Sequence, residues 1–171
     1  DDLGFIWIGT YQGLNRYDGY QMAAFAGEHI LDQRQINTLA KTRDGRIFVS
    51  TEFSGAFFID PKTLKVEKIY AGKLDPEDAF FSPILALTED DSYFYFAIAQ
   101  HVYSYHKQSK KFLHEFSINK EEHIVRALII HDNFLYMGTS NGLFSKNLAD
   151  DHISNIPLTE KQKVTNDNKN V

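Results

Sequence analysis

A short apolar pattern recurs four times along the chain at nearly constant spacing. The first copy, IWIGT at 6–10, is followed by IFVST at 47–51, FYFAI at 94–98 and LYMGT at 135–139. Self-similarity at a period of forty-odd residues is the signature of a repeat architecture, so it constrains the fold more than any other feature. The copies end at Thr10, Thr51, Ile98 and Thr139, which are 41, 47 and 41 positions apart.

Aligned on these ends, the copies share four columns of side-chain chemistry. The first column is large and apolar, the second aromatic, the third apolar and the fourth small. In the first copy the columns hold Ile6, Trp7, Ile8 and Gly9. The counterparts are Ile47, Phe48, Val49 and Ser50, then Phe94, Tyr95, Phe96 and Ala97, then Leu135, Tyr136, Met137 and Gly138.

Each repeat contains about four short runs of strand-forming residues, separated by turns rich in Asp, Gly, Asn and Pro. Four antiparallel strands in forty-odd residues are typical of a β-propeller blade. The nearly continuous apolar second run fits a strand that is buried on both faces. The small column lets neighbouring backbones approach closely. We predict an all-β fold, a β-propeller segment of about four four-stranded antiparallel blades.

The 171 residues suffice for one domain with a substantial core. We expect one propeller segment over 1–171, with blade-like units at about 1–35, 36–83, 84–124 and 125–158 and a polar link at 159–171 towards a next blade. The first unit lacks an innermost strand, and Val171 lies about where a fifth innermost strand would start. Four blades can close a ring at the lower limit of the fold, but no sequence cue marks closure, so we expect part of a larger propeller. Exposed sheet edges at both ends also make a homodimer plausible.

Composition excludes several classes of protein. The net charge is −5 and no run of Lys or Arg exceeds two residues, which argues against nucleic-acid binding. The absence of Cys excludes thiolate catalysis, disulfides and zinc–thiolate sites. No apolar run approaches the roughly 18 residues of a membrane span, so we expect no membrane insertion by this segment. No cofactor is expected.

Candidate catalytic and metal-binding residues are sparse. His101, His106 and His114 fall on successive strands and turns and lack the spacing of a zinc site, so no metal is expected. The acidic clusters at 75–78 and 89–91 lack the alternating ligands and central Gly of a calcium loop and are interpreted as solvated turns. No Gly-x-Ser-x-Gly motif is present. A carboxylate pair that meets only in three dimensions stays open.

A ligand is expected on one end of the blades. In propeller topology, the links between second and third strands open on the same face as the links between blades, and loops on a rigid scaffold commonly carry recognition. Trp7 is either a sugar-stacking platform or a packing residue, and its aromatic column favours packing. The interblade Phe80 and Phe81 either reach across this face or cap the core. The predicted ligand-contact residues are Tyr11, Gln12, Glu52, Phe53, Ser54, Phe80, Phe81, Gln100, Ser140 and Asn141.

The run DDLGFIWIGTYQGLNRYDG at 1–19 resembles the two-component regulator propeller repeat. The form of that repeat is Asp-x-x-Gly-x-Leu-Trp-Ile-Gly-Thr followed by Gly-Leu-x-Arg-Tyr/Phe-Asp. The match is strong in the first unit and moderate in the second and fourth, whereas the third keeps only the apolar spacing. The resemblance implies the periplasmic, extracytoplasmic sensor region of an inner-membrane receptor whose output is a hybrid histidine kinase or a diguanylate cyclase.

The same resemblance implies that this segment does no chemistry itself. It would bind an unknown small-molecule or saccharide signal, contact the remaining blades of the same receptor and relay a signal to the cytoplasmic domain. Two alternatives stay open. One is a secreted propeller that binds another protein. The other is a propeller-fold lyase, which would need carboxylate and histidine side chains converging on a central funnel.

Overall fold

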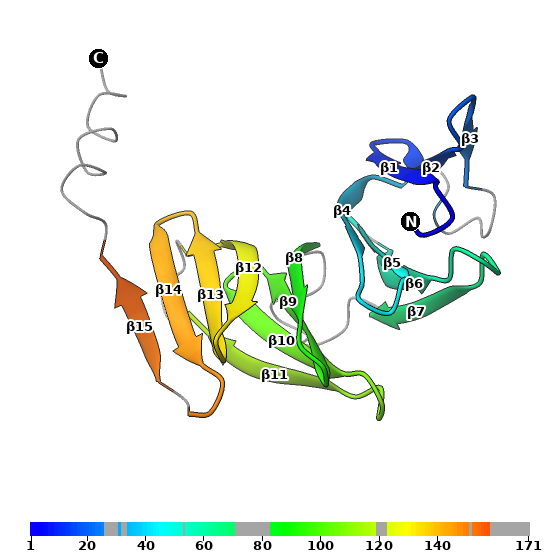
Figure 1. The fold of residues 1–171 in the computed structure, drawn as a ribbon. Helices are drawn as coiled ribbons and strands as arrows, with labels where there is room; N and C mark the ends of the chain where they lie inside the picture. Colours follow the sequence, from blue (N-terminus) through cyan, green and yellow to red (C-terminus); the bar gives the residue numbers. More distant parts are fainter. Residues whose placement is uncertain are drawn as a thin grey trace, which may run out of the picture. The chain divides into compact units, whose positions relative to one another are not determined.

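The computed structural model describes residues 1–25, 31, 34–52, 54–70, 83–118, 123–150 and 152–157. It divides into two compact units, Asp1–Leu87 and Thr88–Val171. The regular elements of the described residues are β-strands in antiparallel sheets (Figure 1). Across these same ranges, no helix is long and apolar enough to cross a membrane.

The strands follow one another in each sheet in the order of the chain. The first sheet has three strands, as expected for a unit without its innermost strand, and each of the others has four. This arrangement confirms the predicted all-β class and the four-stranded blade. The strands are β1 (Ile6–Thr10), β2 (Gly13–Tyr17) and β3 (Met22–Ala24); β4 (Ile36–Lys41), β5 (Ile47–Thr51), β6 (Gly55–Ile59) and β7 (Val66–Tyr70); β8 (Ile84–Glu89), β9 (Tyr93–Ile98), β10 (His101–His106) and β11 (Phe112–Ser117); and β12 (Val125–His131), β13 (Phe134–Thr139), β14 (Gly142–Asn147) and β15 (Ile153–Ile156).

The two-sided burial of the second strand explains its continuous apolar sequence. In the first unit, Trp7 packs against a core that includes Ile47 and Val49 of the next sheet. Phe48, on the opposite face of β5, is also fully buried. Ile6 heads the same column as Ile47 but is 57% exposed, because no sheet of the described residues covers that face. A residue of these apolar columns is therefore buried where a neighbouring sheet packs against its face of the strand.

Small residues in the fourth column allow the first strand of the next sheet to come close. A Cβ atom added to Gly9 would lie 2.6 Å from Cγ2 of Ile36 in β4. At the equivalent place in the next sheet, the Ser50 hydroxyl accepts a hydrogen bond of 3.1 Å from the backbone N–H of Ile84. These contacts confirm the predicted close approach of neighbouring backbones.

The threonine that ends the second strand closes the hairpin to the third strand. Thr51 Oγ1 donates to the carbonyl oxygen of Gly55 and accepts from the backbone N–H of Ser54, each over 3.0 Å. Thr10 and Thr139 make the same two bonds in their own hairpins. The third repeat has Ile98 at this position, and its two-residue link instead places Ala99 at a φ of 50°.

Trp7 is held by packing and by a hydrogen bond. Its ring centroid lies 5.4 Å from that of Phe25, and its Nε1–H donates to Asp1 Oδ2 over 2.6 Å. The other carboxylate oxygen of Asp1 accepts the backbone N–H of Leu3 and of Phe5. The acidic residue and the tryptophan of the repeat are therefore structural, and the packing interpretation of Trp7 is confirmed.

Candidate functional site

Within each unit, the links between second and third strands meet the segments that precede first strands. In the first unit, the backbone N–H of Glu52 donates to the carbonyl oxygen of Gln35 over 3.1 Å. In the second unit, the N–H of Ser140 donates to the carbonyl oxygen of Ile124 over 3.0 Å. We call this end of each unit the loop face. The expectation that the two kinds of link open on one face is confirmed inside each unit.

The predicted ligand-contact residues of the first unit differ in exposure. Tyr11 is 80% exposed and Gln12 is exposed on the β1–β2 link, whereas Glu52 and Ser54 are half-buried on the β5–β6 link. In the second unit, Gln100 is half-buried, and Ser140 and Asn141 are exposed. Phe53, Phe80 and Phe81 lie outside the described residues.

A cavity of about 290 Å³ opens on the loop face of the first unit. It lies between Tyr11, which was predicted to contact a ligand, and residues at the start of β4. We call it the Asn37 pocket. Its lining consists of Gly9, Thr10, Tyr11, Gln35, Ile36 and Asn37.

The Asn37 pocket contains an amide pair with one donor left over. Gln35 Nε2 donates to Asn37 Oδ1 over 3.1 Å. The Nδ2 atom of Asn37 is buried and has no hydrogen-bond partner among the described residues. An unpaired buried donor costs roughly 1–3 kcal/mol, and such groups are rare in folded proteins unless a ligand or water satisfies them. The pocket thus combines an unsatisfied amide with the exposed ring of Tyr11.

Gln35 and Asn37 were not predicted to contact a ligand, because Asn37 lies in a β-bulge and Gln35 directly precedes its strand. β4 pairs with β5 through Ile36 opposite Thr51 and Thr38 opposite Ser50, so Asn37 is the extra residue between two pairs. A bulge re-aims a side chain and is common beside functional sites. A sequence signal was present in the two amides that flank Ile36, but the register shift that brings them together is visible only in the structure.

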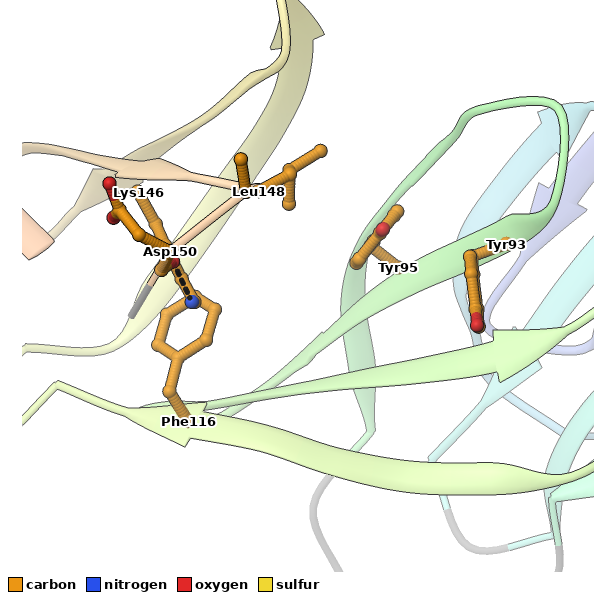
Figure 2. Close-up of a pocket in the computed structure, with 7 residues that line it drawn as sticks. Tyr93, Tyr95, Phe116, Lys146, Leu148 and Asp150 are labelled. Carbon is orange, nitrogen blue, oxygen red and sulfur yellow. Dashed lines mark hydrogen bonds between the residues drawn. The ribbon is translucent and has the colours of Figure 1, made fainter. Parts of the chain in front are cut away.

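A second cavity, of about 300 Å³, lies in the second unit (Figure 2). None of its residues was predicted to contact a ligand. The available signal was a lysine in a column of the repeat that otherwise holds Tyr17, Ile59 and Tyr105. We call this cavity the Lys146 pocket. It is lined by Tyr93, Tyr95, Phe116, Lys146, Leu148, Ala149 and Asp150.

The histidines and acidic residues singled out for metal binding have structural partners where they are described. His101 Nδ1 lies 2.7 Å from the Ser117 hydroxyl at one end of β10, and His106 Nδ1 accepts the N–H of Ser109 at the other end. Glu89 pairs with Lys107 over 2.6 Å. In the part of the chain that the structure describes, no three His, Asp or Glu side chains form a group that could hold a metal ion. The side chain of His114 and residues 75–78 lie outside the described set.

Taken together, the consecutive antiparallel sheets define the chain as a β-propeller segment. No protein-family model matches it. No curated protein matches its sequence.

Solved structures match the fold over most of the chain. Two structures of the extracellular domain of BT4673 from B. thetaiotaomicron, described as a one-component system in one and as a hybrid two-component system in the other, match 92% of the chain with a TM-score of 0.74 and 18% identity. Sqt1 of Saccharomyces cerevisiae matches 86% with a TM-score of 0.67 and 13% identity. The chain spans 22% and 21% of the two BT4673 structures, so it is similar in fold to about a fifth of that domain.

Proposed function

We propose that this chain is a non-catalytic, ligand-binding part of the extracytoplasmic sensor region of an inner-membrane receptor. Two independent observations support the proposal. Residues 1–19 resemble the two-component regulator propeller repeat. The fold is similar to an extracellular domain described as belonging to a hybrid two-component system. In the proposal, the four sheets belong to one propeller with further blades of the same receptor, and a cytoplasmic kinase or cyclase receives the signal.

The Asn37 pocket is the observation that carries the ligand-binding role. The amides of Gln35 and Asn37 offer a donor and an acceptor side by side, which suits hydroxyl groups. The 80% exposed Tyr11 offers an aromatic face beside them. None of the six lining residues is charged. This combination suits a neutral polyhydroxylated ligand, and we propose a mono- or disaccharide.

Titration of the 171-residue chain with a panel of neutral mono- and disaccharides, followed by NMR, tests this role. We expect one panel member to shift the signals of Tyr11 and Asn37. Asn37→Ala and Tyr11→Ala should each weaken that binding by about fivefold, since each removes a hydrogen bond or a stacking surface worth about 1 kcal/mol. Tyr20→Ala is the matched control, because Tyr20 is 96% exposed and lies outside the pocket.

Equal affinity in the Asn37→Ala variant would rule out this pocket as the site. Failure of every sugar in the panel to bind at millimolar concentration would remove the saccharide assignment. The relay of the signal is tested in the intact receptor, where Asn37→Ala should raise the sugar concentration that gives half-maximal output by the same factor. An unchanged dose–response curve would mean that sugar binding in the Asn37 pocket does not control the output of the receptor.

A further inference from the structure

The amide of Asn37 has its acceptor in use and its donor unsatisfied. The Oδ1 atom accepts the Nε2–H of Gln35 over 3.1 Å. The Nδ2 atom is buried and donates to no group of the described residues. Because an amide nitrogen only donates, the ligand atom that satisfies it has to be an acceptor. The Asn37 pocket therefore favours a ligand that places a strong acceptor, such as a carbonyl oxygen, at this point.

Gln35 determines which end of the Asn37 amide is left for a ligand. Its backbone carbonyl oxygen accepts the N–H of Glu52 over 3.1 Å, so its position is tied to the β5–β6 link. Its own Oε1 atom accepts no hydrogen bond from the described residues. The pair thus presents the donor of Asn37 and the acceptor of Gln35. A secondary amide, which has one carbonyl oxygen and one N–H, matches both groups.

An apolar surface lies beside the two amides. A Cβ atom added to Gly9 would lie 2.6 Å from Ile36 Cγ2, so the Ile36 side chain lies directly against the backbone of Gly9. Both residues line the pocket, together with the exposed ring of Tyr11. A methyl group carried by the amide of the ligand would therefore leave water for an apolar surface, which favours binding.

We propose that the Asn37 pocket recognises the acetamido group of an N-acetylhexosamine, an inference that rests on the neutral-saccharide role proposed above and narrows it. The acetamido carbonyl oxygen accepts from Asn37 Nδ2, and the acetamido N–H donates to Gln35 Oε1. The methyl group contacts Ile36, and the sugar ring packs on Tyr11. Because Nδ2 is buried although Asn37 lines the cavity, binding requires a small shift of this side chain towards the ligand. The cavity of about 290 Å³ is at the small end of ligand sites and suits one such sugar.

NMR titration of the 171-residue chain with N-acetyl-D-glucosamine tests this recognition, with D-glucose as the comparator. We expect the acetamido sugar to shift signals at 9–11 and 35–37 and to bind about fortyfold more tightly than glucose. About tenfold of this comes from satisfying the amide pair and about fourfold from burying the methyl group. N-formyl-D-glucosamine, which keeps the carbonyl group but lacks the methyl group, should therefore bind about fourfold more weakly than the acetyl sugar. A nuclear Overhauser contact from the acetyl methyl group to Ile36 is also expected.

Asn37→Asp tests the role of the Asn37 donor. The new carboxylate still accepts the N–H of Gln35 but has no donor for the carbonyl oxygen of the ligand. The preference for the acetamido sugar over glucose should fall from about fortyfold to about fourfold, the contribution of the methyl group. Asn155→Asp is the matched control, because it adds the same charge at an exposed asparagine of β15 outside the pocket. It should leave the preference unchanged.

The outcomes separate this inference from the function on which it rests. Equal affinity of the wild-type chain for the two sugars, with shifts at Tyr11 and Asn37, would overturn acetamido recognition and leave the neutral-sugar site standing. An unchanged preference in Asn37→Asp would overturn the role of the donor. Absence of these shifts with every sugar would remove the proposed site as well. The comparison of sugars in the wild-type chain uses no variant, so it decides the inference even if Asn37→Asp fails to fold.

Discussion

Replacement of Thr51 by valine tests whether the repeated threonine is kept for its hydroxyl group or for its shape. Thr51 is 1% exposed, and its hydroxyl bonds both Ser54 N–H and Gly55 C=O. Valine has nearly the same shape but cannot make either bond. At about 1 kcal/mol for each bond, Thr51→Val should lower the free energy of unfolding by about 2 kcal/mol. This loss corresponds to a factor of about 30 in the folding equilibrium.

Urea denaturation followed by tryptophan fluorescence measures this loss of folding free energy in the first unit. Trp7 is the only tryptophan in the chain, and it packs on the core shared by the first two sheets. Its emission therefore reports unfolding of the first unit. Thr51→Ser provides one control, because it keeps the hydroxyl and removes one methyl group worth about 0.8 kcal/mol.

Thr10→Val provides the second control. Thr10 makes the same pair of bonds, over 2.8 and 3.1 Å, but is half-exposed, so water can replace the lost hydroxyl. We expect it to cost about 0.5 kcal/mol. The reasoning is refuted if Thr51→Val lies within about 0.5 kcal/mol of the wild-type chain, or if Thr10→Val costs as much as Thr51→Val.

Three further predictions use the same denaturation assay or far-ultraviolet circular dichroism. Gly9→Ala should destabilise the first unit by about 1–3 kcal/mol, because the new Cβ would lie 2.6 Å from Ile36 Cγ2; a neutral effect would show that the neighbouring sheets separate without cost. Burial opposes ionisation of Asp44, but hydrogen bonds from Arg46 and a threonine hydroxyl outweigh it and hold the pKa of Asp44 below its usual value. The stability contributed by ionised Asp44 is therefore present above the unfolded-state pKa of about 4 and is lost as the pH falls through the lower native pKa. Asp44→Asn should make the free energy of unfolding fall less steeply in acid. An unchanged acid profile would contradict this role. Ala99→Gly should stabilise the second unit by up to about 1 kcal/mol, since it relieves a φ of 50° in a non-glycine residue; a loss of stability would mean that the methyl group packs usefully.

The periodic columns predicted the strands and their order because side-chain chemistry at each position follows from local burial. Thr10 and Thr51 marked the end of the second strand in the sequence, and both close a hairpin in the structure. Trp7 was correctly assigned to packing. The strand ends and the aromatic column recur in the repeats, so the assignment made in one copy is supported by the equivalent residues of the others.

The candidate pockets depend on side chains that do not repeat, although the register shift that positions Asn37 recurs at the start of β12. Asn37 enters its pocket through a shift of register at the start of β4, and no local preference of the residue predicts such a shift. Lys146 gains its surroundings from Phe116, which is 30 positions away and belongs to another sheet. Among the predicted contact residues that the structure describes, Tyr11 is the single one that lines either pocket.

The sequence by itself determined the class of fold, the strand positions and the residues that hold the hairpins together. These properties depend on neighbours within a few positions or on the repeat period. Only the tertiary structure decided where polar side chains meet a cavity, because the packing of one sheet on the next joins segments that no sequence pattern links. The unsatisfied amide of Asn37 becomes visible as part of a candidate site at that level.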